Sequence, residues 1–404
     1  MVNRAKTCLR SPPASGMVGA AAPDARAKRH QMILLQNGPG GRPALFDAPR
    51  AVIRAGSAAE VAPALAQAEQ ALAAGHWVAG MLAYEAGFAL EPALAGLQRA
   101  AGPLVHLGVY DAPSDGRGTL ARAEAEAVDA HLTAPVPALP RAAHAEAIAR
   151  ALELIRAGDC YQVNLTFPLT AAAQGTPLGL FAALSRVQPV GHGGVVCLPE
   201  APALVSLSPE SFFATDAAGG ITVRPMKGTR PRHPDPAQDA ALAAELCSAV
   251  KDRAENLMIV DLMRNDLSRI CHVGSVRVPQ LFAVESFATV HQMVSEVRGR
   301  LLPGTGFADI LRAIFPCGSI TGAPKIRAMQ IIHDLEPQPR GAYCGAIGWA
   351  GPDGSSAFNV AIRTLVLHPG GAVTLNVGGG VVADSTAEGE WEEALWKARF
   401  ARVT

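Results

Sequence analysis

The sequence lacks any apolar stretch of the ~18 residues that a membrane-spanning helix requires. It also lacks an excess of charge of either sign, because 35 lysines and arginines balance 35 aspartates and glutamates. A surface that binds nucleic acid or an anionic membrane usually carries a basic excess. We therefore expect a soluble, cytoplasmic protein with neither a membrane nor a nucleic acid as its partner.

Regularly paired cysteines are missing as well. The seven cysteines are odd in number, scattered along the chain and never spaced as Cys-x-x-Cys. Disulfide frameworks and zinc sites use such pairs, so the pattern indicates a reducing compartment and argues against both.

The 404 residues are enough for one large domain or for two to three ordinary ones. Residues 1–30 carry six lysines and arginines, one acid and many small residues, which predicts a disordered tail. A signal peptide is the alternative, but the stretch 16–22 is small rather than leucine-rich. Three prolines make 133–140 a predicted linker between an N-terminal part, 31–135, and a second region, 140–404.

Hydrophobic periodicity predicts alternating elements in the N-terminal part. Short apolar runs indicate strands at 32–35, 51–54 and 77–84, and helical spacing indicates a helix over 58–74. A long helix is expected further on, over 236–269. Nothing in the N-terminal part carries chemistry by itself.

Lys227 stands in the segment Arg-Pro-Met-Lys-Gly-Thr-Arg. A lysine with the ordinary pKa of about 10.4 is almost fully protonated at neutral pH, and only the free amine attacks carbon. Burial or a nearby cation would lower that pKa. A lone turn lysine is more commonly a solvated surface residue. Whether Lys227 is such a residue or a nucleophile therefore has to be judged from the polar residues predicted to lie near it.

Glu210 ends the apolar segment Leu204–Glu210 and precedes Lys227 by 17 residues, which fits a hairpin that turns at 217–220. The carboxyl and the amine would then face the same region. An ordinary cross-strand ion pair explains this spacing as well as catalysis does.

Two acid pairs occur at helical spacing. Asp252 and Glu255 lie three residues apart, and Glu390 and Glu393 repeat that spacing on another predicted helix. Two helices that each present paired acids can converge on Mg²⁺, which prefers oxygen ligands. Solvated helix faces are the alternative.

Three further features add capacity to bind an anion. Three consecutive glycines, Gly378–Gly380, end a predicted strand, and their unencumbered N–H groups can cradle a carboxylate or phosphate. The segment Gly318–Lys325 opens a predicted helix, where N–H groups and the dipole favour an anion, but it lacks the order of a nucleotide P-loop. Arg363 interrupts another apolar strand with a side chain suited to forked carboxylate binding.

These segments together resemble the chorismate-utilising enzymes. The matching motifs, in the family's order, are Ser206–Glu210, Pro225–Thr229, Lys251–Asp266, Gly318–Lys325 and Gly378–Ser385. The resemblance is closest to the aminodeoxychorismate synthase component I branch, over residues 140–400. It implies an α+β fold, a single large domain with two mixed β-sheets packed face to face and helices outside.

The residue before Gly228 and Thr229 separates the activities of this family. The resemblance implies lysine there for aminodeoxychorismate synthesis and alanine for anthranilate and isochorismate synthesis. In the implied reaction Lys227 attacks C2 of chorismate, the C4 hydroxyl leaves with a proton from Glu210, and ammonia then enters at C4 and expels the lysine. Glu210 must stay protonated for this, so we expect an apolar setting that raises its pKa.

The resemblance also implies the ligands of a cofactor and of the substrate. Mg²⁺ is the implied cofactor, with Glu255 and Glu393 as its ligands and Asp252 and Glu390 in support. The substrate-carboxylate positions fall on Tyr343, Arg363, Gly378, Gly379, Gly380 and Lys397, and other pocket positions fall on Gly228, Thr229, His291 and Ser319. The counterpart of His291 in the anthranilate branch is linked to pyruvate loss, a step that this branch should not perform.

The implied reaction needs a source of ammonia. The region before the linker is too short for a glutamine-hydrolysing domain, and its one cysteine, Cys8, sits in no nucleophile motif. A separate glutamine amidotransferase subunit is therefore the expected partner, and making 4-aminobenzoate for folate would require a further lyase. Two alternatives stay open: anthranilate synthase component I, and a non-catalytic anion-binding module that retains the fold.

Overall fold

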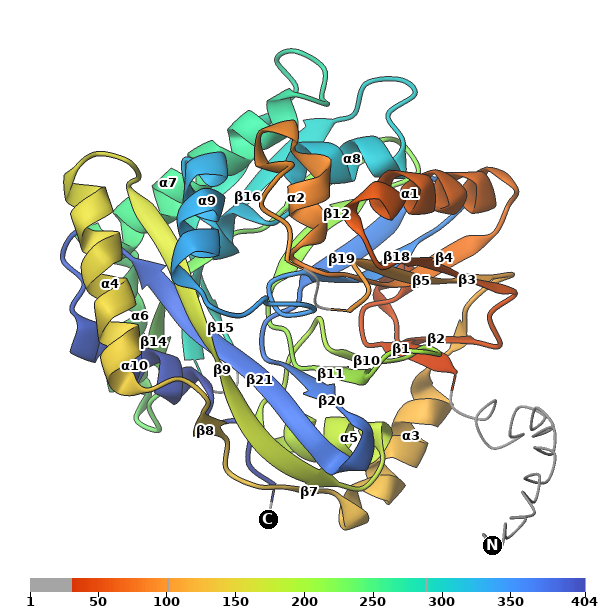
Figure 1. Cartoon of the computed structure of the whole chain (residues 1–404), viewed down its shortest axis with the longest axis horizontal. Helices are drawn as coiled ribbons and strands as arrows, with labels where there is room; N and C mark the ends of the chain where they lie inside the picture. The colour runs from red at the N-terminus through yellow and green to blue at the C-terminus, as the bar shows by residue number, and fades with distance from the viewer. Residues whose placement is uncertain (1–30, 100–101, 288–289, 404) are drawn as a thin grey trace, which may run out of the picture. The chain divides into compact units, whose positions relative to one another are not determined.

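Two antiparallel β-sheets face each other in the computed structural model, which describes residues 31–99, 102–287 and 290–403 (Figure 1). In these ranges sheet A has eleven strands, in the order β17 (Gly322–Ala323), β9 (Gln162–Gln174), β21 (Ala372–Val381), β20 (Thr364–Leu367), β11 (Ala203–Ser206), β10 (Gly194–Cys197), β1 (Met32–Leu35), β2 (Ala44–Asp47) and β6 (Ser114–Asp115), with β7 (His131–Leu132) and β8 (Val136–Pro137) beside β9. Sheet B has ten strands there, in the order β14 (Met226–Pro231), β16 (Val290–Arg300), β13 (Gly220–Val223), β12 (Ser211–Thr215), β19 (Ser356–Val360), β18 (Ala346–Ala350), β4 (Trp77–Leu82), β5 (Val105–Tyr110) and β3 (Ala51–Ala55), with β15 (Arg277–Ser286) beside β16. The predicted disordered tail, 1–30, lies outside the described residues.

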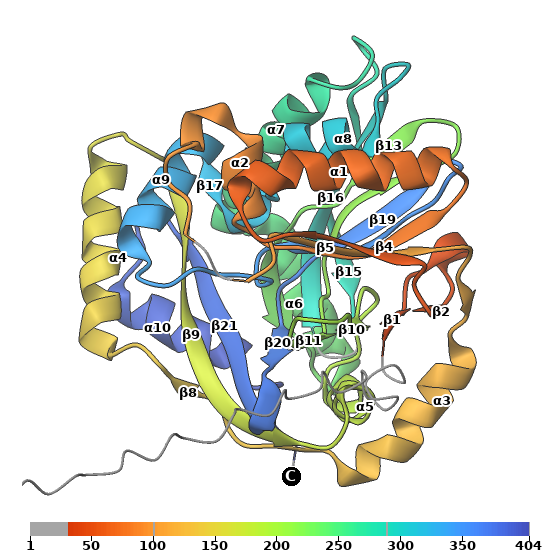
Figure 2. The same ribbon diagram turned by 45° about the vertical axis from the view of Figure 1, so that its right-hand side comes forward.

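Helices cover the outer faces of both sheets (Figures 1 and 2). Their bounds are α1 (Ala58–Ala73), α2 (Ala86–Leu90), α3 (Arg117–Glu126), α4 (Arg141–Arg156), α5 (Pro177–Val187), α6 (Pro236–Ser248), α7 (Val250–Ser268), α8 (Phe307–Ile314), α9 (Lys325–Leu335) and α10 (Ala387–Lys397). Helices α1, α2 and α8 lie over sheet B, α4, α9 and α10 lie along β9 and β21, and α5 packs against β10 and β11.

The predicted α+β class, the two facing sheets and the outer helices are confirmed. The expectation of mixed sheets is wrong, because every strand pairing among the described residues is antiparallel. Antiparallel neighbours can be joined by short turns, as β10–β11, β12–β13 and β18–β19 are, whereas parallel neighbours need long crossover connections.

Sheet A is buried on both of its faces. In β1, Ile33 and Leu35 belong to the core shared with sheet B, whereas Leu34 between them belongs to a second core under α5. Successive strand residues point to opposite faces, so a strand covered on both sides is apolar at every position. This explains why the predicted strand at 32–35 is apolar at every position.

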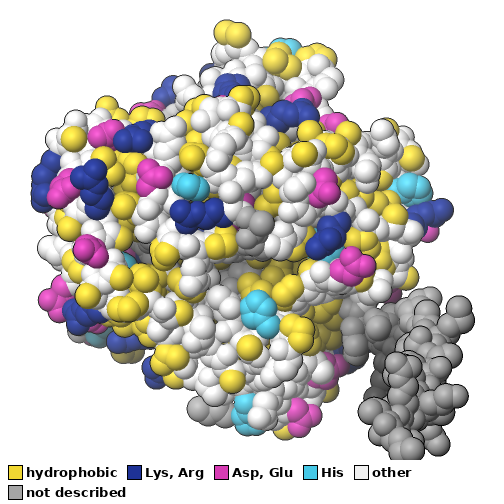
Figure 3. Space-filling model, in the orientation of Figure 1, with side chains coloured by type: hydrophobic (Ala, Val, Ile, Leu, Met, Phe, Trp, Pro, Cys, Tyr) yellow, Lys and Arg dark blue, Asp and Glu magenta, His cyan; other side chains and the backbone are white. Residues whose placement is uncertain are grey.

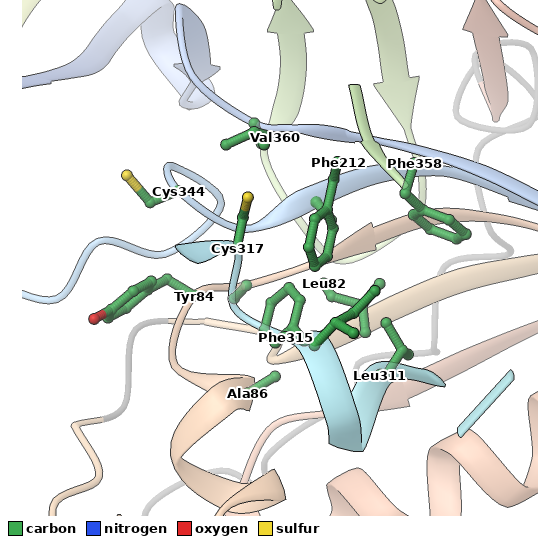
Figure 4. Close-up of a cluster of buried hydrophobic side chains, with 14 of the residues drawn as sticks. Leu82, Tyr84, Ala86, Phe212, Leu311, Phe315, Cys317, Cys344, Phe358 and Val360 are labelled. Atoms are coloured by element: carbon green, nitrogen blue, oxygen red, sulfur yellow. The ribbon is translucent and has the colours of Figure 1, made fainter. Parts of the chain in front are cut away.

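Aromatic side chains fix the strands that lead into the functional region. Figure 4 shows Phe212 of β12 and Phe358 of β19 pointing toward Leu311 and Phe315 at the end of α8. The ring centroids of Phe212 and Phe315 lie 6.1 Å apart. Burying one such ring stabilises the fold by about 1.5–3 kcal/mol, which holds in place the strand that starts directly after Glu210.

The predicted elements of the N-terminal part are found with small changes of their bounds, but the long helix expected over 236–269 is divided. Helix α6 ends at Ser248, and Ala249 has ψ 110°, outside the helical range. The hydroxyl of Ser248 donates to the carbonyl oxygens of Ala244 and Glu245, both at 3.1 Å, and so satisfies the last turn of α6. Helix α7 therefore begins anew at Val250.

The predicted linker 133–140 runs alongside β9, where Val136 pairs with Thr170. Strands from both sides of it share each sheet, and the described residues from 31 onward form one compact unit. No helix in the described ranges is long and apolar enough to cross a membrane. On the face seen in Figure 3, basic and acidic side chains are interspersed.

Candidate active site

A cavity of about 610 Å³ opens where β20 ends and leaves one edge of β21 uncovered. Strand β20 pairs with β21 only as far as Leu375, whereas the pairing of β21 with β9 continues to Val381. All the site residues predicted from the sequence line this cavity except Gly379 and His291. The fold thus gathers side chains from β14, α7, α10 and three loops around one free strand edge.

Lys227 projects from a β-bulge in β14. The pairing of β14 with β16 shifts its register between Met226 and Thr229, and Gly228 has φ +84°. A bulge redirects the side chain that it carries, and glycine adopts this φ without strain. The bulge at Met226–Thr229, which Gly228 allows, therefore directs the lysine side chain into the cavity.

The surroundings of Lys227 lower the pKa of its amine. The side chain of Lys227 is surrounded by protein atoms except where it lines the cavity. Burial is the largest cause of the lowered pKa of its amine. The charge of Glu255 acts in the opposite sense, and the charge of Lys397 adds to the lowering. The free amine is therefore more populated here than in an exposed lysine.

Glu210 lies in the loop directly before β12 and is 6% exposed. Its backbone N–H donates to the Ser208 hydroxyl, and its carbonyl oxygen accepts from Val360 in β19. Burial raises the pKa of the Glu210 carboxyl to about 7, against the lowering effects of a hydrogen bond from Ser319 and the charge of Lys227. The expectation of a raised pKa is confirmed.

The free edge of β21 presents backbone groups to the cavity. The amine of Lys397 donates to the carbonyl oxygen of Gly378 over 2.9 Å. In a strand the N–H and C=O of one residue point the same way and the pattern repeats every second residue, so Gly378 and Gly380 both direct N–H groups to this side. Such N–H groups, which have no strand partner there, can donate to a carboxylate.

The three glycines also allow close approach. A β-carbon on Gly378 would lie 2.1 Å from the carbonyl oxygen of Leu165. On Gly379 it would lie 2.8 Å from Glu390 Oε2, and on Gly380 it would lie 2.5 Å from Gln162 Nε2. Glycine is therefore required by β9 at the first position and by functional side chains at the other two. Gly379 does not line the cavity, but it allows α10 to approach β21.

The four acids predicted as metal ligands come from two helices beside the cavity, Asp252 and Glu255 from α7, and Glu390 and Glu393 from α10. Burial raises the pKa of Glu255 and of Glu390, and the charge of Glu393 raises both further. The two helices thus bring their acids within range of mutual repulsion.

These residues suit a divalent cation that is held by few protein ligands. Across the described ranges, no three acidic, histidine or cysteine side chains are clustered closely enough to hold a metal ion. Mg²⁺ commonly uses one or two carboxylates together with water and a substrate anion. Glu393 accepts from Lys397 at 2.8 Å and Asp252 from Arg230 at 3.0 Å, whereas Glu255 has no hydrogen-bond partner within the described structure. The oxygen donors of Glu255 and Glu393 fit this chemistry.

Arg363 lies in a break between two strands and not inside one. Strand β19 ends at Val360 and β20 begins at Thr364, and Arg363 between them has φ +49°. Its carbonyl oxygen accepts from Leu207 over 2.9 Å, which fixes the break against the loop that carries Glu210. Burial lowers the pKa of Arg363, and the nearby Tyr343 acts in the opposite sense. Both side chains line the cavity.

His291 does not line the cavity, in contrast to the expectation from the sequence. Its Nε2 lies 2.9 Å from Asp239 Oδ1, and its Nδ1 lies 2.8 Å from the hydroxyl of Ser286. The ring is 2% exposed and is held between α6 and β15. The pairing of β14 with β16 accounts for this position, because Arg230, not Lys227, is the residue opposite His291.

Sequence reasoning missed several polar residues at or beside the cavity, among them Gln162, Asn164, Arg230 and Lys251. Gln162 and Asn164 alternate in β9 with core residues, and the alternation of buried polar and apolar residues was the available signal. Gln162 is fully buried, and neither polar atom of its side chain has a partner in the described structure. Lys251 and Arg230 also line the cavity. Lys251 pairs with an aspartate at 3.1 Å, a contact between distant segments that spacing does not reveal.

Comparison with known proteins places these features in a family. A family model described as chorismate binding enzyme matches residues 30–402. Aminodeoxychorismate synthase component 1 of Escherichia coli K12 is 45% identical over 259 residues, which cover 64% of this chain and 56% of the relative. Anthranilate synthase component 1 of Streptomyces coelicolor is 43% identical over 261 residues, which cover 65% of this chain and 51% of the relative. The chain thus spans about half the length of the curated relatives it matches.

Solved structures share the fold along almost the whole chain. The anthranilate synthase component I of Streptococcus pneumoniae TIGR4 superposes with a TM-score of 0.73 and 25% identity, over 96% of this chain and 95% of that one. A putative isochorismate synthase from Bacillus anthracis gives the same TM-score at 22% identity, over 94% and 96%.

Proposed function

The chain belongs to the family of chorismate binding enzymes, and we propose that it converts chorismate and ammonia to 4-amino-4-deoxychorismate. The observation that carries this proposal is the position of Lys227 and Glu210 in one cavity, where burial lowers the pKa of the amine and raises that of the carboxyl. The two shifts favour a free amine as nucleophile and a protonated carboxyl as proton donor in the same cavity.

The proposed reaction has two allylic displacements. The Lys227 nitrogen forms a bond to C2 of chorismate, the ring double bonds shift, and the C4–O bond breaks as Glu210 gives its proton to the leaving hydroxyl. Ammonia then forms a bond to C4, the double bonds shift back, and the C2–N bond to the lysine breaks. A covalent detour avoids direct displacement of a poor leaving group.

The cavity also offers complementary groups for the carboxylates of chorismate. The free edge of β21 supplies N–H groups, and Arg363 and Tyr343, which also line the cavity, supply side-chain donors. Glu255 and Glu393 would hold Mg²⁺, with Asp252 and Glu390 in support, and the ion would neutralise a ring carboxylate. Burial of these acids and the repulsion between Glu255, Glu390 and Glu393 favour a bound cation.

The ammonia would come from a separate glutamine amidotransferase subunit. The name of the Escherichia coli relative, component 1, is that of one part of an assembly. Free ammonium at high concentration should replace the subunit in the test of the reaction.

Anthranilate synthesis is the second candidate, because anthranilate synthases are also among the relatives. Lys227 in the cavity favours the first candidate, since it would have no role as a nucleophile in the second. The position of His291 away from the cavity also favours the first candidate.

Incubation of the purified chain with chorismate, Mg²⁺ and ammonium tests the proposal. We expect 4-aminobenzoate only after addition of an aminodeoxychorismate lyase. Anthranilate as the main product would establish the second candidate, and unchanged chorismate would favour the non-catalytic anion-binding module.

A further inference from the structure

Asn164 of β9 lines the cavity of the candidate active site with a side chain that has no partner in the protein. The residue is 7% exposed, and its carboxamide forms no hydrogen bond with the described residues. Its neighbours on the same face of β9 differ from it. The hydroxyl of Thr166 donates to Glu336 over 3.1 Å, and both polar atoms of the Gln162 side chain are sealed in the core, whereas those of Asn164 are not. Buried polar groups usually have a hydrogen-bond partner, so a ligand in the cavity is the expected partner of this carboxamide.

The backbone fixes Asn164 against the segment that carries Ser319. The N–H of Asn164 donates to the carbonyl oxygen of Thr321 over 2.8 Å. The guanidinium of Arg340 donates to the carbonyl oxygen of Asn164 at 2.6 Å and to that of the residue after Ser319 at 2.9 Å. Ser319 in turn donates to Glu210. Asn164 therefore lies on the side of the cavity where the proposed proton donor is held.

Asn164 also lies on the face of sheet A that Lys227 approaches. It is paired with Gly380 of β21. Residues directly opposite each other in an antiparallel pair have β-carbons about 4.5–5.5 Å apart on the same face. A β-carbon on Gly380 would lie 3.3 Å from Lys227 Nζ. Because Gly380 has no side chain, the carboxamide and the amine border the same space.

In the proposed reaction, ammonia is the reactant to which no binding group has yet been assigned. Glu210 serves the leaving hydroxyl, and the N–H groups of β21, Arg363 and Mg²⁺ serve the carboxylates. Ammonia attacks through its lone pair, so an acceptor for its N–H bonds would orient it. A neutral oxygen suits this task, because a carboxylate would favour ammonium, which has no lone pair. Resting on the proposed function, we propose that Asn164 Oδ1 accepts a hydrogen bond from ammonia and directs its lone pair to C4 of the ring.

Asn164→Leu tests this assignment, since leucine has a similar size and no acceptor. We expect kcat/KM for ammonia to fall about tenfold or more. The kcat/KM for chorismate at saturating ammonium should change by less than about twofold, because ammonia attacks only after the first displacement. The melting temperature should stay equal or increase, since no hydrogen bond within the described structure is lost. Asn164→Ala, which adds no bulk, should show the same fall for ammonia.

Thr166→Val is the matched control. It removes a buried hydroxyl from the same face of β9, two residues away and outside the cavity, and should leave kcat/KM for ammonia unchanged. An unchanged value in both Asn164 variants, an equal fall for chorismate and ammonia, or the same fall in Thr166→Val would overturn the inference. Wild-type chain that forms no aminodeoxychorismate would instead refute the proposed function, so the two failures are distinguishable.

Discussion

The Ser319 hydroxyl donates a hydrogen bond to Glu210 Oε1 over 2.8 Å, and both side chains are buried. A bond donated to a carboxylate favours its charged form, so Ser319 opposes the effect of burial on Glu210. The pKa of about 7 is the balance of these influences and of the charge of Lys227, which also lowers it. Without the hydrogen bond from Ser319, the pKa of Glu210 would be higher and the carboxyl would stay protonated to a higher pH.

Ser319→Ala should move the alkaline limit of activity upward. The proposed reaction needs protonated Glu210, so the rate should fall as the pH rises through the pKa of this carboxyl. Loss of the hydrogen bond raises that pKa further, so the fall should occur about one pH unit higher than in the wild type. The measurement is kcat against pH with ammonium as the nitrogen source.

Ser206→Ala is the matched control for this experiment. Ser206 is a buried serine of β11 whose hydroxyl contacts Thr364 at 2.9 Å, and it does not line the cavity. Its removal should leave the alkaline limit in place. A Ser319→Ala profile that coincides with the wild-type profile would contradict the proposed role of Glu210.

Lys227→Met should abolish product formation while the fold is kept. Methionine has a similar length and lacks the nucleophile, so the rate with ammonium should fall by at least about 10³-fold. Affinity for Mg²⁺ should remain, because Lys227 is not among the proposed ligands. Rapid quenching of the wild-type reaction, followed by mass spectrometry, should reveal a chorismate-derived adduct on the peptide that contains Lys227.

Lys251→Met is the corresponding control, because Lys251 lines the same cavity but pairs with Asp384 at 3.1 Å. We expect it to raise KM for chorismate with a much smaller effect on kcat. Full activity of Lys227→Met, or an adduct on another lysine, would rule out the covalent route.

Glu255→Gln should weaken the dependence on Mg²⁺. The change keeps the size of the side chain and removes one oxygen charge, so the Mg²⁺ concentration for half-maximal activity should rise about tenfold or more. Without Mg²⁺ the melting temperature should stay equal or increase, because burial and the neighbouring Glu393 already disfavour a charged Glu255.

Glu392→Gln serves as the control on α10. Glu392 is exposed and lies 3.9 Å from Arg141, outside the cavity, although it is adjacent in sequence to Glu393. Its variant should need the same Mg²⁺ concentration as the wild type. If Glu255→Gln behaves in the same way, the proposed metal site is wrong.

The sequence predicted those helices and strands whose apolar residues recur with a clear helical or strand spacing. The run at 32–35 is β1, and the helix expected over 58–74 is α1, because apolar spacing alone defines each. The break at Ala249 was missed, since the hydroxyl of Ser248 ends α6 in a sequence that is otherwise compatible with one helix. The direction of strand pairing was missed because it depends on connections between elements and not on residues within them.

In the candidate site, too, local sequence features were predicted, whereas features that depend on contacts between distant elements were missed. Lys227 and Glu210 were selected correctly as neighbours because a hairpin brings them together over a short length of chain. His291, which the resemblance implied as a pocket residue, lies elsewhere because β14 and β16 pair in a register that places it opposite Arg230. The buried amide of Gln162 was overlooked although polar and apolar residues alternate in β9, and its closeness to Gly380 arises only from the pairing of β9 with β21.

Gly380→Ala and Gly378→Ala should separate the function of the triplet from its stability. A β-carbon on Gly378 meets the backbone carbonyl of Leu165 at 2.1 Å, and that backbone is fixed by the pairing with β9, so the variant should be destabilised by about 1–3 kcal/mol. A β-carbon on Gly380 meets the side chains of Gln162 at 2.5 Å and Lys227 at 3.3 Å, and both can move without loss of a backbone hydrogen bond. Thermal melts should therefore show little change for Gly380→Ala, whereas its kcat should fall because the amine is displaced from its position. A stable and fully active Gly380→Ala variant would show that the amine does not need this position, and would count against Lys227 as the nucleophile.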